Sequence, residues 1–336
     1  MDVDSWPVFM RFNQNTSIQK EVAERIARIY DGAGFKILYY DGAEDVNKPY
    51  WYNIGNAQLI VYNALKHKHI LAEGAAMSHF SWHILSRGNA FDTFYPKEIK
   101  DAVKKYAIKE IEKTSNDFTS IDFGWINYVK PGIKTTRAEI DYNSKKLEWF
   151  TESLNETTIG VQPDMLEYVE SLATSWNCPV SLVGNLEDLR LHPRNSDNME
   201  VLRRWEDVKI NGLLTKKDIK EIKNGKQEHI LLIDENGNYE LQPYKRISKE
   251  NSKVRAFLFH RKNKVWVVYW HISGDGFIEL PIGSDVIKLY KELGEEISLE
   301  KSNDKVKLPV GSRKYIQFEL NYDETKDIFS KMIIHE

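Results

Sequence analysis

The sequence has a single cysteine, Cys178, in 336 residues. One cysteine excludes an internal disulfide and any zinc site built from several cysteines. Cys178 directly precedes the apolar run PVSLV, where a buried, unreactive thiol is expected rather than a nucleophile. Candidate catalytic groups must therefore be sought among other residue types.

Long apolar runs and concentrated charge are also lacking. No run reaches the ~18 apolar residues of a membrane-spanning helix, and the N-terminal MDVDSW has neither the basic nor the apolar region of a signal peptide. The 47 Lys and Arg residues are scattered and nearly balanced by 50 Asp and Glu residues, for a formal net charge of -3. A nucleic-acid-binding protein usually shows a concentrated basic patch instead. We expect a neutral or weakly charged partner, and neither nucleic acid nor a membrane.

Two common site motifs are missing as well. No G-x-G-x-x-G follows an apolar run, so the usual nucleotide fingerprint is absent, and no G-x-S-x-G marks a serine nucleophile. His79 and His83 have the i, i+4 spacing of two metal ligands on a helix, but no third ligand stands out. We expect no cofactor and no metal.

Strand and helix patterns alternate over residues 1–212. Short β-rich apolar runs predict strands at residues 6–12, 35–40, 69–72, 120–128, 157–161 and 179–184. Helical spacing predicts a first helix between the caps at 15–17 and the glycines at 32 and 34. Further helices are predicted at 52–67, 96–113, 137–154, 165–176 and 198–209. Residues 78–92, rich in Ser, His, Gly and Asn, are predicted as a loop. The helix at 165–176 follows Pro163, because proline is favoured at a first helical position.

This alternation is typical of parallel strands joined by helices, and it favours a TIM-type (β/α) barrel over a doubly wound open sheet. A closed barrel needs eight strands. The six predicted here therefore imply either that the first strands are missing from the chain or that the count is short.

The pattern changes after residue 225. Regular short β runs are separated by turn sequences such as ENGN, RKNK and SGDG, which is typical of an antiparallel β-sandwich. A single core seldom grows past ~250 residues, so two domains are expected. We expect an α/β barrel domain over residues 1–212, a charged helical connector over 213–225 and an all-β sandwich domain over 226–336.

The runs FKILYYDG and KHILAEG share a feature that indicates chemistry, because each ends in a carboxylate followed by glycine. Residues just past the C-terminal ends of barrel strands form active sites, so Asp41 and Glu73 are our candidate catalytic residues. Such a pair can cleave a glycosidic bond: one carboxylate attacks the anomeric carbon or activates a water, and the other protonates the leaving oxygen. Asp41 suits the first role and Glu73 the second, with retention or inversion left open. In the alternative interpretation, Asp41 only forms a turn and Glu73 a salt bridge.

Sugar binding needs flat aromatic faces and hydrogen-bonding side chains, and both follow the same strands. Glu44 and Asp45, in the loop after Asp41, could also take a catalytic role, but Asp41 directly ends the apolar run. We expect substrate contacts from Glu44, Trp51, His79, Trp82, His83, Arg87, Asp122, Trp125 and Asn185.

The strand ends KILYYDGAE and HILAEG, followed by a β-rich region with the run VWVVYWHISGDGFIELP, resemble the retaining α-glycosidases of the endo-α-N-acetylgalactosaminidase and α-galactosidase kind. The resemblance implies that Asp41 is a nucleophile at the end of barrel strand four and Glu73 an acid/base at the end of strand five, with strands one and two missing. It also implies a tail module of bacterial polysaccharide-degrading enzymes, and a periplasmic or secreted location. The residues after Glu73, GAAMSHF, depart from the galactosaminidase pattern and leave the sugar open.

These features predict a glycoside hydrolase that acts on an oligosaccharide or polysaccharide through Asp41 and Glu73. Two alternatives remain. One is a non-catalytic carbohydrate-binding protein on a partial barrel, and the other is a barrel isomerase or lyase that uses one carboxylate as a base.

Overall fold

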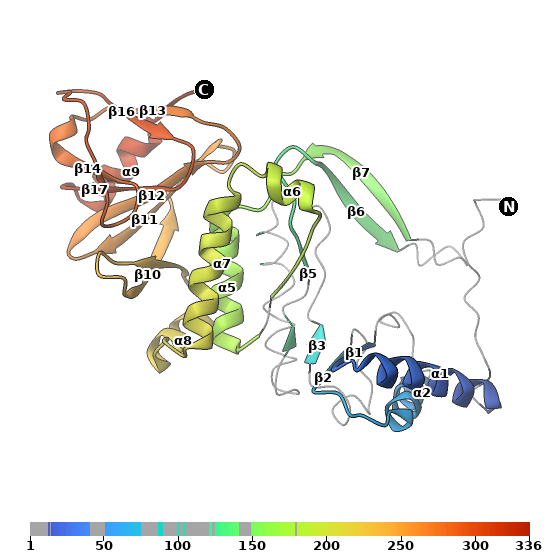
Figure 1. The fold of residues 1–336 in the computed structure, drawn as a ribbon. Helices are drawn as coiled ribbons and strands as arrows, with labels where there is room; N and C mark the ends of the chain where they lie inside the picture. The colour runs from blue at the N-terminus through green and yellow to red at the C-terminus, as the bar shows by residue number, and fades with distance from the viewer. Residues whose placement is uncertain are drawn as a thin grey trace. The chain divides into compact units, whose positions relative to one another are not determined.

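The computed structural model describes residues 13, 15–40, 51–74, 87–89, 100, 104, 121–122, 125–140, 149–178 and 180–336 (Figure 1). Contacts divide the chain into two compact units, Met1–Ala90 with Lys109–Phe123 and Phe91–Ile108 with Gly124–Glu336. The first unit combines helices with a parallel sheet. The second combines helices with antiparallel sheets and one parallel pair of short strands.

Two helices of the first unit pack against each other. α1 (Ser17–Ala33) ends at Gly34, whose φ of 69° lies in the left-handed region and closes the helix as predicted. Its partner is α2 (Trp51–Ala64). Ala27 and Tyr30 of α1 form a small core with Leu65, which directly follows α2. This core fixes the two helices side by side.

The sheet of the first unit is entirely parallel. Its strands, in spatial order, are β1 (Ile37–Tyr40), β2 (Leu71–Gly74), β3 (Arg87–Asn89) and β4 (Ile121–Asp122). The strands predicted at 35–40 and 69–72 are confirmed, and β3 lies where a loop was expected. Spatial order follows chain order, as in a barrel, and no reversal of a doubly wound sheet occurs among these strands. The described strands do not close into a barrel, and the strand predicted at 6–12 lies outside the described residues.

The helices predicted in the second unit at 165–176 and 198–209 are confirmed, as is the helical connector predicted at 213–225. α5 (Pro163–Trp176) begins with the predicted proline and packs against α7 (Asn195–Ile210) and α8 (Lys216–Lys223). A short helix, α6 (Leu186–Leu191), precedes α7. β5 (Trp125–Asn127) and β8 (Ser181–Val183) form a parallel pair within the runs predicted as strands. Cys178, between α5 and β8, is buried as expected.

Two sequence predictions in this unit are wrong. Residues 137–154, predicted as a helix, contain most of β6 (Lys134–Ile140) and β7 (Trp149–Thr157), which pair as an antiparallel ribbon (Figure 1). The strand predicted at 157–161 is irregular after Thr157 and turns at Gly160, where φ is 71°. Charges in this stretch fit the surface of a helix equally well, but the structure pairs its backbone across two strands, and such pairing can outweigh local propensity.

The β-region predicted after residue 225 forms two antiparallel sheets. The larger has the order β15-β14-β17-β12-β11-β10-β9, and the smaller the order β16-β13-β18. The strands are β9 (Glu228–Ile233), β10 (Tyr239–Arg246), β11 (Val254–Arg261), β12 (Lys264–His271), β13 (Gly276–Leu280), β14 (Ile287–Tyr290), β15 (Glu296–Ile297), β16 (Val306–Val310), β17 (Lys314–Phe318) and β18 (Ile333–His335). The antiparallel sheet is thus confirmed, while α9 (Tyr322–Ser330) and β18 were not predicted.

Turn chemistry sets the register of the first hairpin. Asp234 accepts hydrogen bonds from the backbone N–H groups of Asn236 and Asn238, at 2.8 and 2.7 Å. Gly237 has a φ of 84°, which favours glycine at this position. The turn pairs Ile233 with Tyr239 across β9 and β10, and the predicted hairpin is confirmed.

The large sheet has an apolar core on each face. One core combines its strands with the small sheet and α9, for example through Val267, Ile278 and Phe329. The other is aromatic: Tyr244 and Phe257 stack with ring centroids 4.7 Å apart, and Phe257 and Trp270 at 5.5 Å. Tyr244 also donates a hydrogen bond to the backbone carbonyl of Asp164 in α5, at 3.4 Å. The aromatic face is therefore linked to α5.

Two buried carboxylates of α5 bind the sheet. Asp164 accepts hydrogen bonds from Arg255 of β11 at 2.6 Å and from Lys100 at 3.1 Å. Glu167 accepts from Arg313 at 2.9 Å, from the indole of Trp205 at 2.7 Å and from the backbone N–H of Leu231 at 3.0 Å. Because both carboxylates are excluded from solvent, these partners supply the interactions that water would otherwise make.

Replacing Asp164 with asparagine is expected to lower the free energy of unfolding by about 3 to 5 kcal/mol at pH 7, because Arg255 and Lys100 would stay buried beside a neutral group. Burial alone would raise the pKa of Asp164, but Arg255 and Lys100 more than offset it and lower that pKa to about 2. The folded pKa lies below the ordinary value of 3.8, so this stabilisation is present above that pH and is lost as the pH falls towards 2.

Urea unfolding followed by circular dichroism, at pH 7 and between pH 5 and 2, measures both effects. The control is Asp327→Asn, which breaks an exposed ion pair with Lys331 and should change stability by less than ~1 kcal/mol. An Asp164→Asn protein with the stability and acid sensitivity of the unsubstituted protein would contradict the role given to this carboxylate.

Candidate functional site

The C-terminal edge of the parallel sheet gathers part of the predicted site. Tyr39 of β1 pairs with Glu73 of β2, and Tyr40 pairs with Gly74. Asp41, the residue after Tyr40, lies outside the described residues. Glu73 thus lies near the end of β2, next to β1, which ends at Tyr40, the residue before Asp41. Neighbouring backbones in such sheets lie ~4.8 Å apart.

The next strands extend this edge. Arg87 of β3 pairs with Glu73, and Asp122 of β4 pairs with Asn89 of β3. Three of the residues predicted from sequence, Glu73, Arg87 and Asp122, thus lie on adjacent strands of one sheet, although they come from separate segments of the chain. The structure describes their backbones but not their side chains.

Of the remaining predicted residues, some have only their backbone described, one is fully described, and others lie outside the described part of the chain. Trp51 begins α2 and Trp125 begins β5, with backbones but not side chains described. Asn185 is fully described: its amide oxygen accepts a hydrogen bond from the Asp188 N–H at 2.7 Å and caps α6. The residues that lie outside the described part of the chain are Asp41, Glu44, His79, Trp82 and His83.

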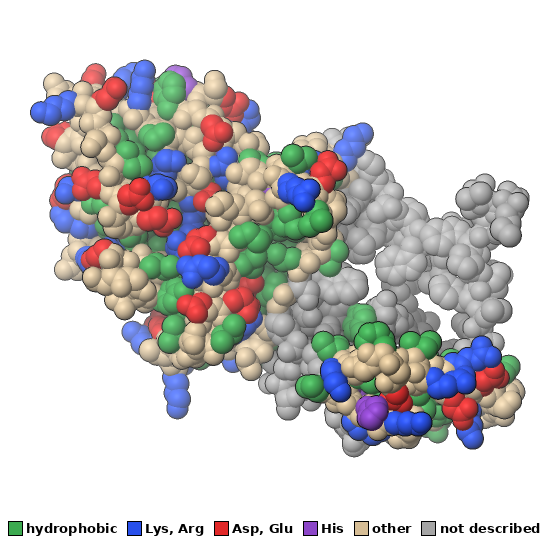
Figure 2. Space-filling model, viewed as in Figure 1, with side chains coloured by type: hydrophobic (Ala, Val, Ile, Leu, Met, Phe, Trp, Pro, Cys, Tyr) green, Lys and Arg blue, Asp and Glu red, His purple; other side chains and the backbone are tan. Residues whose placement is uncertain are grey.

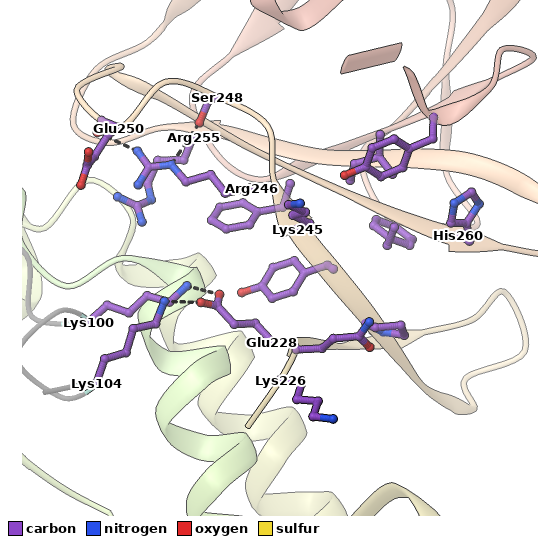
Figure 3. Close-up of a pocket in the computed structure, with 17 residues that line it drawn as sticks. Lys100, Lys104, Lys226, Glu228, Lys245, Arg246, Ser248, Glu250, Arg255 and His260 are labelled. Atoms are coloured by element: carbon purple, nitrogen blue, oxygen red, sulfur yellow. Dashed lines mark hydrogen bonds and ion pairs between the residues drawn. The ribbon is translucent and has the colours of Figure 1, made fainter. Parts of the chain in front are cut away.

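A cavity of about 790 Å³ lies in the second unit, beside β9, β10 and β11 (Figure 3). Its described basic lining residues come from distant parts of the chain: Lys100, Lys104, Lys226, Lys245, Arg246 and Arg255. Tyr244 and Phe257 form part of the wall. Over the face drawn in Figure 2, acidic and basic side chains are interspersed.

Ion pairs organise the inner part of the cavity. Glu228, the first residue of β9, accepts hydrogen bonds from both Lys100 and Lys104, which Figure 3 shows reaching its carboxylate side by side. Lys100 also bonds Asp164, and its ammonium lies 5.3 Å from the ring centroid of Phe257. The guanidinium of Arg246 donates to the backbone carbonyls of Lys249 and Glu250 at 3.1 and 2.7 Å. These contacts fix several of the cations in place.

Sequence reasoning missed this cavity. Its basic residues are separated by up to 155 positions, from Lys100 to Arg255, and no local pattern joins them. The dipeptide Lys245-Arg246 at the end of β10 is the one short signal, and it is weak because a solvated strand end often carries such charge. The cluster forms only when β9, β10 and β11 pair.

Glu170 is another carboxyl of α5 with a shifted pKa, and it does not line the cavity. Burial raises the pKa of Glu170 to about 8; Lys209 opposes the shift, while Glu206 and Glu167 add to it. Its Oε2 atom has no hydrogen-bond partner among the described residues. A raised pKa is also found in catalytic acids, but a carboxyl enclosed in the helical layer gives a substrate no access. We assign Glu170 no catalytic role.

Stability is expected to fall as the pH rises from about 4.5 to about 8, because folded Glu170 keeps a proton that the unfolded chain releases. Glu170→Gln removes this dependence. The free energy of unfolding of the variant should therefore be higher than that of the unsubstituted protein by about 2 kcal/mol or more at pH 8, and nearly equal to it at pH 5. Calorimetric melting at the two pH values measures the difference, with Glu300→Gln on the surface as control. An equal gain in stability at both pH values would show that the pH dependence does not come from the proton held by Glu170.

Neither a metal site nor a membrane span is found in the described part of the chain. No cluster of three or more His, Cys, Asp or Glu side chains there could hold a metal ion. None of the described helices is long and apolar enough to cross a membrane.

No family model matches the sequence, and no curated protein matches it. Among solved structures, an α-amylase from Geobacillus thermoleovorans, crystallised with acarbose, is 9% identical with a TM-score of 0.33; the match covers 92% of this chain and 65% of that one. A noncanonic maltogenic α-amylase, AmyB from Thermotoga neapolitana, is 10% identical with a TM-score of 0.33, covering 93% of this chain and 68% of that one. An α-amylase from H. orenii is 11% identical with a TM-score of 0.27, covering 91% and 66%.

The chain spans less than two thirds of the first of these structures. All three are named as α-amylases, not as the galactosaminidase or galactosidase kind that the sequence resembles. At these TM-scores the likeness assigns neither a fold nor a family to the chain.

Proposed function

We propose that this protein is a glycoside hydrolase that cleaves a glycosidic bond in an oligosaccharide or polysaccharide through Asp41 and Glu73. The observation that carries the proposal is the register of β1 and β2. Glu73 pairs with Tyr39, two residues before Asp41, in a parallel sheet. Carboxylates at the C-terminal ends of adjacent parallel strands are placed to act on one substrate.

In the proposed reaction, Asp41 attacks the anomeric carbon while protonated Glu73 gives its proton to the leaving oxygen. The glycosidic bond breaks and a covalent glycosyl–Asp41 ester forms. Glu73, now ionised, takes a proton from water, and the resulting hydroxide attacks the anomeric carbon and releases Asp41. Two successive displacements retain the configuration of the sugar. Arg87, paired with Glu73 on the next strand, is a candidate to bind a substrate hydroxyl or to hold the Asp41 carboxylate ionised.

The test measures hydrolysis of aryl α- and β-glycosides and of a panel of oligosaccharides by the full chain, with Asp41→Ala and Glu73→Ala. Each variant is expected to lose at least about 10²-fold in kcat/KM on natural oligosaccharides. Asp304→Asn and Glu300→Gln, both exposed in the β-region, serve as matched controls and should keep full activity.

Added azide separates the two roles. With an activated aryl glycoside, azide should replace the Asp41 carboxylate in Asp41→Ala and give a glycosyl azide of inverted configuration. In Glu73→Ala, azide should attack the covalent intermediate and give the retained configuration. A protein that binds oligosaccharides but hydrolyses none, with or without the substitutions, would contradict the proposal and favour a carbohydrate-binding protein.

A further inference from the structure

We propose that the cavity beside β9, β10 and β11 binds an acidic oligosaccharide, which its lysines contact at the carboxylate or sulfate groups and its aromatic rings at the sugar faces. The cavity lies wholly within the second compact unit. Its volume of about 790 Å³ falls in the range of small-molecule sites, ~300–1,000 Å³. The proposal concerns binding alone and stands whether or not Asp41 and Glu73 catalyse hydrolysis.

The first argument is the balance of charge. Two acidic residues, Glu228 and Glu250, line the described part of the cavity beside six basic ones. Asp164, the buried partner of Lys100 and Arg255, brings the carboxylates to three. Among the described residues, positive charge is therefore in excess in a concave site, where the surrounding protein weakens the screening of charge by water.

The second argument is that this excess is available to a ligand. Lys226 and Lys245 are exposed, and neither has an ion-pair partner among the described residues. Lys104 keeps 43% of its side chain exposed while it contacts Glu228. By contrast, Lys100 is buried and held by Asp164 and Glu228. The cavity thus has fixed charges inside and free lysines at its opening.

The third argument is the presence of flat rings. Tyr322, the first residue of α9, is half-buried and stacks with the exposed His260 of β11, with centroids 6.3 Å apart and planes 21° from parallel. Both line the cavity. In Figure 3, His260 and the pair Lys100 and Lys104 lie at opposite ends of the group. This pair of rings, on the face of the large sheet that carries α9, offers a flat surface to a sugar ring.

An acidic oligosaccharide combines the two chemistries in one chain, because its rings offer C–H faces and its carboxylates or sulfates offer charge. A nucleotide fits less well, since the sequence has neither of the glycine-rich phosphate-binding motifs, G-x-G-x-x-G and G-x-x-x-x-G-K. A nucleic acid needs an extended basic surface, whereas charges of both signs are interspersed over the face in Figure 2. The expectation of a neutral or weakly charged partner, drawn from composition, is thereby revised for this cavity.

Isothermal titration calorimetry of the full chain tests the proposal with trigalacturonate and with a heparin hexasaccharide. The trimethyl ester of trigalacturonate is the neutral match, and ATP and inorganic sulfate are the competing anions. We expect at least one acidic saccharide to bind at least about tenfold more tightly than the neutral ester. Its affinity should fall as the sodium chloride concentration is raised.

The decisive variant is Lys226→Glu with Lys245→Glu, since both side chains are exposed and unpaired. This double substitution should lower the affinity for the acidic saccharide by at least about tenfold for each lysine replaced. The control is Lys216→Glu with Lys301→Glu, which makes the same change of net charge at exposed positions outside the cavity lining and should leave binding unchanged. Tyr322→Ala should weaken the binding of the saccharide and leave the binding of inorganic sulfate unaltered.

Several results would overturn the proposal. They are failure of both acidic saccharides to bind, equal binding of trigalacturonate and its ester, or equal losses in the cavity and control variants. Binding of ATP without the saccharides would make the cavity a phosphate site instead. Because the readout is binding, a loss of hydrolysis in the Asp41 or Glu73 variants has no bearing on it, and the two proposals fail independently.

Discussion

The second unit depends on two carboxylates that α5 carries into its interior. Asp164 and Glu167, one turn apart, are both excluded from water, and each is neutralised by an arginine from the β-region, Arg255 or Arg313. A buried charge is tolerated only with a partner and further hydrogen bonds. An arrangement of α5 and the β-region that separated these carboxylates from their arginines would leave buried charges without partners.

The same constraint shapes the cavity. Lys100 and Arg255 neutralise Asp164, and Lys100 then shares Glu228 with Lys104. The carboxylates on the inner side are thereby already occupied by fixed cations, so the exposed Lys226 and Lys245 are left to meet a ligand. The structural ion pairs and the proposed binding charge thus belong to one network.

The sequence predicts well those features that local chemistry controls. Gly34 closes α1, Pro163 opens α5 and the Asp234 turn sets the first hairpin, each through its own backbone preference. It fails over residues 137–154, where pairing between β6 and β7 outweighs local propensity. It also cannot reveal the cavity, whose charges meet only after β9, β10 and β11 pair. For the candidate site, the sequence supplied the carboxylates, and the structure adds that Glu73 lies on the strand paired with β1, which ends at Tyr40.

The distance between the carboxyl groups of Asp41 and Glu73, in a crystal structure of the full chain with a bound oligosaccharide, tests the proposed hydrolase most directly. A separation of about 5 to 5.5 Å, with the scissile bond between the two groups, is the result expected for a retaining enzyme, and about 6.5 to 9.5 Å would indicate an inverting one. Carboxyl groups on opposite faces of the sheet, or too far apart for a sugar ring and a water to bridge, would contradict the catalytic assignment.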